Sequence, residues 1–154
     1  NFVFANIIIY KSLQYSELFN GIIIGEERKY RKSTLRKEDK EKIAQQIKCY
    51  IESNRAYLNP NISLLDLSSS LNINSKFISQ TINEKFNQNF FEFINSYRIK
   101  YAKELMKDSE RKERRILEIL YESGFNSKSA FNNAFKKFTG LTPSQYKNQN
   151  LHSK

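Results

Sequence analysis

The feature that most constrains this chain is an internal repeat. A short apolar helix, a tight turn and a second helix are expected over 64–86, and the same pattern returns over 116–139, about 52 residues later. The apolar positions of the two copies correspond in order: Ile73 with Phe125, Ile78 with Phe131, and Ile82 with Phe135. A unit of helix, tight turn and helix is the helix-turn-helix motif. The sequence therefore predicts an all-α fold that contains two helix-turn-helix subdomains.

Local capping signals predict where the helices of the repeat begin. Ser63 is expected to cap a helix over 64–71, because Asp66 three residues later completes a capping box. Asn74 and Ser127 are expected to cap the second helix of each unit, because both side chains can accept hydrogen bonds from free backbone N–H groups.

Two further helices are expected outside the repeat. Asn89 with Glu92 predicts the start of a long helix over 90–107, which would join the two units as a linker helix. An amphipathic helix is expected over 38–58, and the Asn-Pro-Asn sequence at 59–61 would end it. The predicted architecture is thus two helix-turn-helix subdomains joined by a long linker helix and preceded by an extra N-terminal helix and arm.

Composition narrows the class of function. Lys and Arg number 26 against 16 Asp and Glu, which gives a formal net charge of +10. Such an excess is typical of proteins that bind nucleic acid or acidic membranes, although a basic surface without a polyanionic partner is the alternative. A single cysteine, Cys49, is expected to pack beside the apolar face of its helix, with a sensor thiol as the alternative, and the single histidine is His152. With so few ligands, and no paired-carboxylate motif or Gly-rich phosphate loop, no enzyme, cofactor or metal site is expected.

The second helix of each unit has an outward face suited to reading DNA. In a helix-turn-helix this helix lies in the major groove, where Asn and Gln can pair with adenine and Ser and Lys can contact bases or phosphates. Neither outward set contains an acid, and a solvated helix face is the alternative interpretation. The residues expected to point outward are Ser75, Lys76, Ser79, Gln80 and Asn83 in the first unit, and Lys128, Ser129, Asn132, Asn133 and Lys136 in the second.

Two segments of the second half resemble the signature of the AraC/XylS family of bacterial transcription regulators. They are Gly-Phe-Asn-Ser-Lys-Ser-Ala-Phe at 124–131 and Phe-Lys-Lys-Phe-Thr-Gly-Leu-Thr-Pro-Ser-Gln-Tyr-Lys at 135–147. The segment 89–99 is similar to the start of the family's linker helix, so that the resemblance covers about 61–149. It implies seven helices in two helix-turn-helix subdomains, and binding in two successive major grooves on one face of double-stranded DNA.

The resemblance also implies contact residues. Together with the outward faces it gives the base-contact candidates Lys76, Ser79, Gln80, Asn83, Ser129, Asn132 and Asn133. The phosphate-contact candidates are Ser75, Ser127, Lys128, Lys136 and Lys137. One departure is Leu120, which stands where the family usually has Ala, so we expect the helices of the second unit to shift slightly.

The N-terminal part resembles, less specifically, a membrane-tethered subset of the family. Short apolar patches are followed by six basic residues: Arg28, Lys29, Arg31, Lys32, Arg36 and Lys37. That order is typical of the cytoplasmic exit of a membrane helix, and a basic linker of a soluble protein is the alternative. The expected domains are an arm or juxtamembrane-like connector at 1–37, a connecting helix at 38–59, the DNA-binding domain at 60–148 and a tail at 149–154.

The partners expected beside DNA are RNA polymerase, a membrane tether upstream of residue 1, and a second copy of the chain. The helix at 38–58 would either pack on the DNA-binding domain or pair with that second copy. The expected location is the cytoplasm. A different class of function is a protein–protein interaction domain that uses the 12 Phe and 9 Tyr side chains as a surface. A salt titration of binding distinguishes the DNA-binding function from the protein–protein interaction function, because binding to phosphates weakens steeply with salt.

Overall fold

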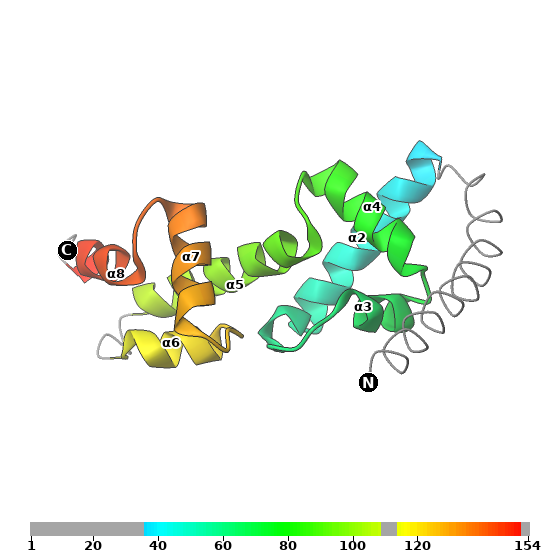
Figure 1. Cartoon of the computed structure of the whole chain (residues 1–154). Coiled ribbons are helices and arrows are strands. Elements are labelled where there is room, and N and C mark those ends of the chain that lie inside the picture. Colours follow the sequence, from blue (N-terminus) through cyan, green and yellow to red (C-terminus); the bar gives the residue numbers. More distant parts are fainter. Residues whose placement is uncertain (1–35, 109–113, 152–154) are drawn as a thin grey trace, which may run out of the picture. The chain divides into compact units, whose positions relative to one another are not determined.

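A computed structural model describes residues 36–108 and 114–151, so the expectations about the first 35 residues lie outside the described part. Over the described residues the chain is all-α, which confirms the predicted fold class (Figure 1). The elements are α2 (Lys37–Ser53), the 3₁₀ helix η1 (Ala56–Leu58), α3 (Leu64–Leu71), α4 (Ser75–Phe86), α5 (Phe90–Lys107), α6 (Ile116–Glu122), α7 (Lys128–Thr139) and α8 (Pro143–Leu151).

The helices of the repeat begin where their capping residues predict. Ser63 and Asp66 form a capping box at the start of α3, in which the Ser63 N–H donates to the Asp66 carboxylate over 2.8 Å. These hydrogen bonds from Ser63 lower the pKa of Asp66. The Asn74 side chain accepts from the Lys76 N–H at the start of α4, and Ser127 accepts from the Ala130 N–H at the start of α7. The second helix of each unit is therefore anchored at its N-terminus, which directly follows the turn.

The helix that precedes the repeat belongs to the core of the first unit. Three isoleucines of α2, at positions 43, 47 and 51, are buried, and α2 packs against α3 and α4. Leu67, Ile78 and Ile82 are fully buried in the same unit. Of the two uses expected for this helix, packing on the DNA-binding domain is the one that the structure shows.

The end of α2 differs from the sequence expectation. A helix through residue 58 was expected, but α2 ends at Ser53 because Arg55 adopts a left-handed conformation with φ 47°. Leu58 consequently lies in η1 and not on the apolar face of α2. The expectation for Cys49 was also wrong, since its thiol is exposed and its sulfur lies 3.7 Å from the Ser53 hydroxyl.

The second unit has an aromatic core. The Phe131 and Phe135 rings are fully buried and lie 5.5 Å apart in an edge-to-face arrangement. Leu120, the departure from the usual alanine, is buried in this cluster with Phe125. The linker helix α5 contributes buried side chains, and α8 adds the half-buried Tyr146. The aromatic residues of this unit are therefore largely core residues.

The linker helix α5 is tied to both units at a junction formed by Tyr57, Asn59, Arg98, Gly124 and Phe125. The Arg98 guanidinium donates to the Tyr57 carbonyl over 2.7 Å and to the Asn59 carbonyl over 2.8 Å. Its central carbon also lies 5.4 Å from the centre of the Phe125 ring in the turn between α6 and α7. Burial lowers the pKa of Arg98, but an arginine keeps its charge in such a site. One buried cation thus connects α5 to the loop before α3 and to the second helix-turn-helix.

Candidate nucleic-acid interface

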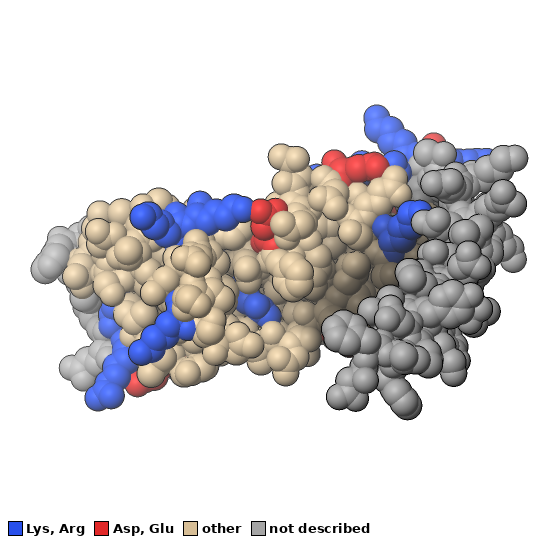
Figure 2. All heavy atoms as spheres, viewed as in Figure 1, with Lys and Arg blue, Asp and Glu red and all other residues tan. Residues whose placement is uncertain are grey.

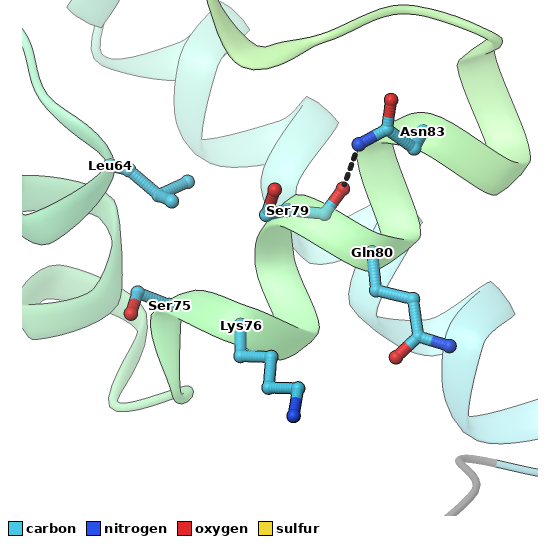
Figure 3. A pocket seen from close by; sticks show the side chains of 6 residues that line it. All are labelled: Leu64, Ser75, Lys76, Ser79, Gln80 and Asn83. Atoms are coloured by element: carbon cyan, nitrogen blue, oxygen red, sulfur yellow. Dashed lines mark hydrogen bonds between the residues drawn. The ribbon is translucent and has the colours of Figure 1, made fainter. Parts of the chain in front are cut away.

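The first candidate DNA-reading surface lies on α4. Five of the expected contact side chains line one surface hollow together with Leu64 of α3, namely Ser75, Lys76, Ser79, Gln80 and Asn83 (Figure 3). Ile78 and Ile82 point to the opposite side and are fully buried. The amphipathic pattern of α4 therefore brings these expected residues of the first unit together.

Two of these side chains already have hydrogen-bond partners. The Asn83 amide donates to the Ser79 carbonyl one turn earlier, over 3.1 Å (Figure 3). The Gln80 amide nitrogen donates to the Glu84 carboxylate over 2.8 Å. Gln80 is only half exposed, whereas Lys76 and Asn83 are exposed. The reading surface of α4 is thus partly organised by contacts within the protein.

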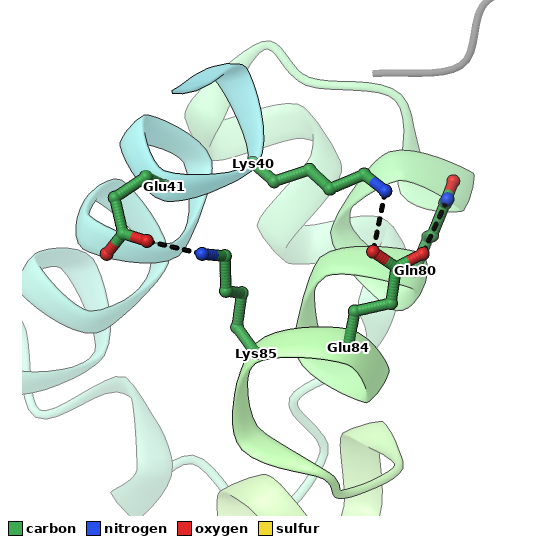
Figure 4. A network of polar contacts seen from close by, with 5 residues as sticks. All are labelled: Lys40, Glu41, Gln80, Glu84 and Lys85. Carbon is green, nitrogen blue, oxygen red and sulfur yellow. Dashed lines mark hydrogen bonds and ion pairs between the residues drawn. The ribbon is translucent and has the colours of Figure 1, made fainter. Parts of the chain in front are cut away.

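Two neighbouring ion pairs join α4 to α2 beside this surface (Figure 4). Lys40 of α2 contacts the Glu84 carboxylate at 2.6 Å, and Glu41 pairs with Lys85. Hydrogen bonds from Lys40 and then Gln80 are the largest causes that lower the pKa of Glu84. No acid is expected from the sequence on the outward face of α4. The structure corrects this, because Glu84 is exposed and touches an expected reading residue.

The second candidate surface lies on α7. Its outward residues are exposed, while Phe131, Ala134 and Phe135 are buried on the other side. The Ser129, Asn132 and Asn133 side chains form no hydrogen bond with another described residue. These three side chains are therefore available to a ligand without breaking an internal contact.

Some of the side chains expected to contact phosphates already have a partner within the protein, and others are exposed. Lys128 and Lys136 are exposed, but Lys137 forms an ion pair with Glu92 at the start of α5. Glu92 is also the capping-box partner of Asn89, and the hydrogen bonds from Lys137 and Asn89 lower its pKa. The Ser127 hydroxyl serves as the N-cap of α7. Lys137 and Ser127 would thus bind phosphate only in addition to a structural contact.

On the face drawn in Figure 2, the basic side chains are distributed and not concentrated in one patch. The Lys and Arg side chains lie in several groups, and the acidic groups visible there adjoin basic ones. Such an arrangement leaves a net positive surface, which attracts a polyanion over a distance set by the salt concentration.

Across 36–108 and 114–151, His, Cys, Asp and Glu side chains form no cluster that could hold a metal ion. None of the described helices combines the length and the hydropathy that crossing a bilayer requires.

Sequence reasoning missed the residues that support the two surfaces. Glu84 follows Gln80 by four residues, a spacing at which helical side chains meet, so that contact had a local signal. The contacts of Lys40 and Arg98 had no local signal in the sequence, because their partners lie 44 and about 40 residues away.

Comparison with known proteins bears on the family and the fold of the chain. Residues 67–149 match the model of a family described as a helix-turn-helix domain. The chain is similar to the TCP pilus virulence regulatory protein of Vibrio cholerae serotype O1, with 30% identity in an alignment of 142 residues that covers 89% of this chain and 48% of that protein. The chain therefore spans about half the length of this relative.

Two solved structures are similar to the described fold. One is the C-terminal domain of AraT, a response regulator from Geobacillus stearothermophilus, with a TM-score of 0.61 and 25% identity over 76% of this chain and 88% of that chain. The other is a transcriptional regulator of the AraC-type DNA-binding domain proteins from Chromobacterium violaceum, with a TM-score of 0.58 over 72% of this chain and 98% of that chain. At 15% identity, the second likeness concerns the fold alone.

Proposed function

This chain belongs to the AraC/XylS family of helix-turn-helix transcription regulators, and from that premise we propose that it recognises a specific double-stranded DNA site. It carries the DNA-binding domain of a regulator and is not an enzyme. The proposal adds that α4 and α7 lie in two successive major grooves on one face of the DNA.

The observation that carries this proposal is the pairing of two similar helices on one linker. Both α4 and α7 are capped at the turn, buried on one side by apolar residues, and polar on the other. Both are attached to α5, and the Arg98 junction connects α5 to the two units. A fixed spacing between two reading helices is what recognition of two adjacent half-sites requires.

Each expected contact residue has a proposed role. Side chains near the start of each reading helix would contact base edges, and flanking serines and lysines would hold phosphates. The proposed base contacts are Lys76, Ser79, Gln80, Asn83, Ser129, Asn132 and Asn133. The proposed phosphate contacts are Ser75, Ser127, Lys128, Lys136 and Lys137.

Substitution of one amide on each helix tests the base contacts. Gln80→Ala and Asn133→Ala should each weaken binding to a site selected from random duplexes by about 1–3 kcal/mol, because a base would lose its hydrogen-bond partner. Binding to unrelated DNA should change little. Equal losses on selected and unrelated DNA, measured at one salt concentration, would mean that these amides do not read bases.

The second candidate function is a protein–protein interaction surface. Phe91 and Tyr121 support it, because they are 73% and 60% exposed. The largest aromatic side chains of the described core, Phe93, Phe131 and Phe135, are not available for such a surface. A salt titration of DNA binding distinguishes the two functions, since only phosphate contacts give a steep decrease of affinity with salt.

The division of the chain and its wider partners are also proposals. We propose a connector at 1–37 beside a membrane-bound part, a connecting helix at 38–59, the DNA-binding domain at 60–148 and a tail at 149–154. The DNA-binding part would act in the cytoplasm and contact RNA polymerase. A homodimer through 38–58 would have to use the exposed side of α2, because its apolar side is buried within the unit.

A further inference from the structure

A chain of three polar side chains runs from α2 to the reading surface of α4 (Figure 4). Lys40 contacts one oxygen of the Glu84 carboxylate at 2.6 Å, and the other oxygen accepts from the Gln80 amide nitrogen at 2.8 Å. The Glu84 side chain is 44% exposed and the Lys40 side chain 15% exposed. The carboxylate therefore lies between a cation of α2 and a residue expected to read a base.

The chemistry of the three groups fixes the orientation of the Gln80 amide. An ionised carboxylate only accepts hydrogen bonds, so it must face the NH₂ end of the amide and not its oxygen. An amide without such a partner can turn by half a rotation and exchange its donor and acceptor ends. Glu84 thus leaves the Gln80 oxygen and one remaining N–H free to face a ligand.

Adenine recognition needs such a fixed amide. The major-groove edge of adenine offers one acceptor, N7, and one donor, the N6 amino group, which an amide meets with its own donor and acceptor. We propose that Glu84 is a specificity-determining positioning residue, which sets Gln80 to read an A·T pair and is held in place by Lys40. This inference rests on the proposed function.

Lys40 would also reduce the repulsion between Glu84 and a nearby DNA phosphate. A bare carboxylate at a DNA surface would repel phosphates, and the ammonium group of Lys40 offsets that charge. The same contact favours the ionised form of Glu84, because hydrogen bonds from Lys40 and then Gln80 lower the pKa of its carboxyl. A protonated Glu84 could donate a hydrogen bond and would no longer select one orientation of the amide.

The neighbouring ion pair supplies a matched control. Glu41 and Lys85 join the same two helices, one residue further along each helix, and make no hydrogen bond to Gln80 (Figure 4). Glu84→Gln and Glu41→Gln each remove one negative charge and one link between α2 and α4. Only the first removes the acceptor that orients Gln80, because a glutamine amide can pair with either end of another amide.

The experiment measures base discrimination with the full 154-residue chain. Wild type first selects duplexes from a random pool, and Gln80→Ala then identifies the base pair whose preference depends on Gln80. The ratio of affinities for A·T and G·C at that pair should fall about tenfold in Glu84→Gln. In Glu41→Gln the ratio should stay within about twofold of wild type. Thermal unfolding of each variant shows that it is folded.

A double-mutant cycle completes the test. In a chain that carries Gln80→Ala, the further change Glu84→Gln should leave the base preference unchanged, because Glu84 acts only through Gln80. Wild-type discrimination in Glu84→Gln, or equal losses in Glu84→Gln and Glu41→Gln, would overturn the inference while the proposed function stands. If wild type selects no site, the proposed function fails and the inference fails with it.

Discussion

Replacing Gly124 with alanine is expected to lower the free energy of unfolding by about 3 kcal/mol, because the new methyl group has neither the backbone conformation nor the space that it needs. Gly124 has φ 87°, which L-residues rarely adopt. A Cβ atom there would lie 2.6 Å from the Tyr57 carbonyl oxygen and 2.9 Å from the Leu58 Cα. Both atoms belong to the backbone of η1 and cannot move aside alone. Urea unfolding of the full chain measures the loss.

Gly140 provides the control for this prediction. It also has a left-handed φ, 76°, but no atom lies within 4 Å of the position that its Cβ would take. Gly140→Ala should therefore cost only about 1 kcal/mol, the price of the backbone conformation alone. Equal losses in the two variants would show that the close approach of Gly124 to η1 contributes nothing.

The second large effect is expected at Arg98. Arg98→Met should reduce the free energy of unfolding by about 3 kcal/mol, because the Tyr57 and Asn59 carbonyls lose a charged donor at a partly buried site. Methionine retains much of the apolar length of the side chain, so the loss reports mainly on the hydrogen bonds. Arg98→Lys should recover only part of it, since an ammonium group lacks the planar fork that reaches two carbonyls.

Lys100 offers the comparison on the same helix. It is exposed, so Lys100→Met should change stability by no more than about 0.5 kcal/mol. Thermal or urea unfolding of the two methionine variants gives the difference. If Arg98→Met proved as stable as Lys100→Met, the junction would not hold the two units together.

Helix starts could be predicted from the sequence because caps are local. Ser63, Asn74, Asn89 and Ser127 each form the expected hydrogen bond with a backbone N–H two or three residues later. The end of α2 could not be predicted, because it depends on the left-handed backbone conformation of Arg55. No residue preference signals that conformation in advance.

The candidate site was predictable only in its outline. Helical periodicity separates the buried isoleucines and phenylalanines from the outward polar residues, so the faces of α4 and α7 follow from the sequence. The contacts that hold those faces in place do not follow from the sequence. Lys40 reaches Glu84 across 44 residues and Lys137 reaches Glu92 across 45, and these meetings exist only after the helices have packed.

Selection of bound duplexes, followed by a change of half-site spacing, tests the central claim most directly. If the Arg98 junction fixes α4 and α7 on one linker, wild type should select two half-sites about 10 bp apart, one helical turn of DNA. Inserting about 5 bp between them would place the second half-site on the opposite face and should reduce specific binding to the level of one half-site. Selected sites whose half-sites tolerate any spacing, with undiminished affinity after the insertion, would contradict the account.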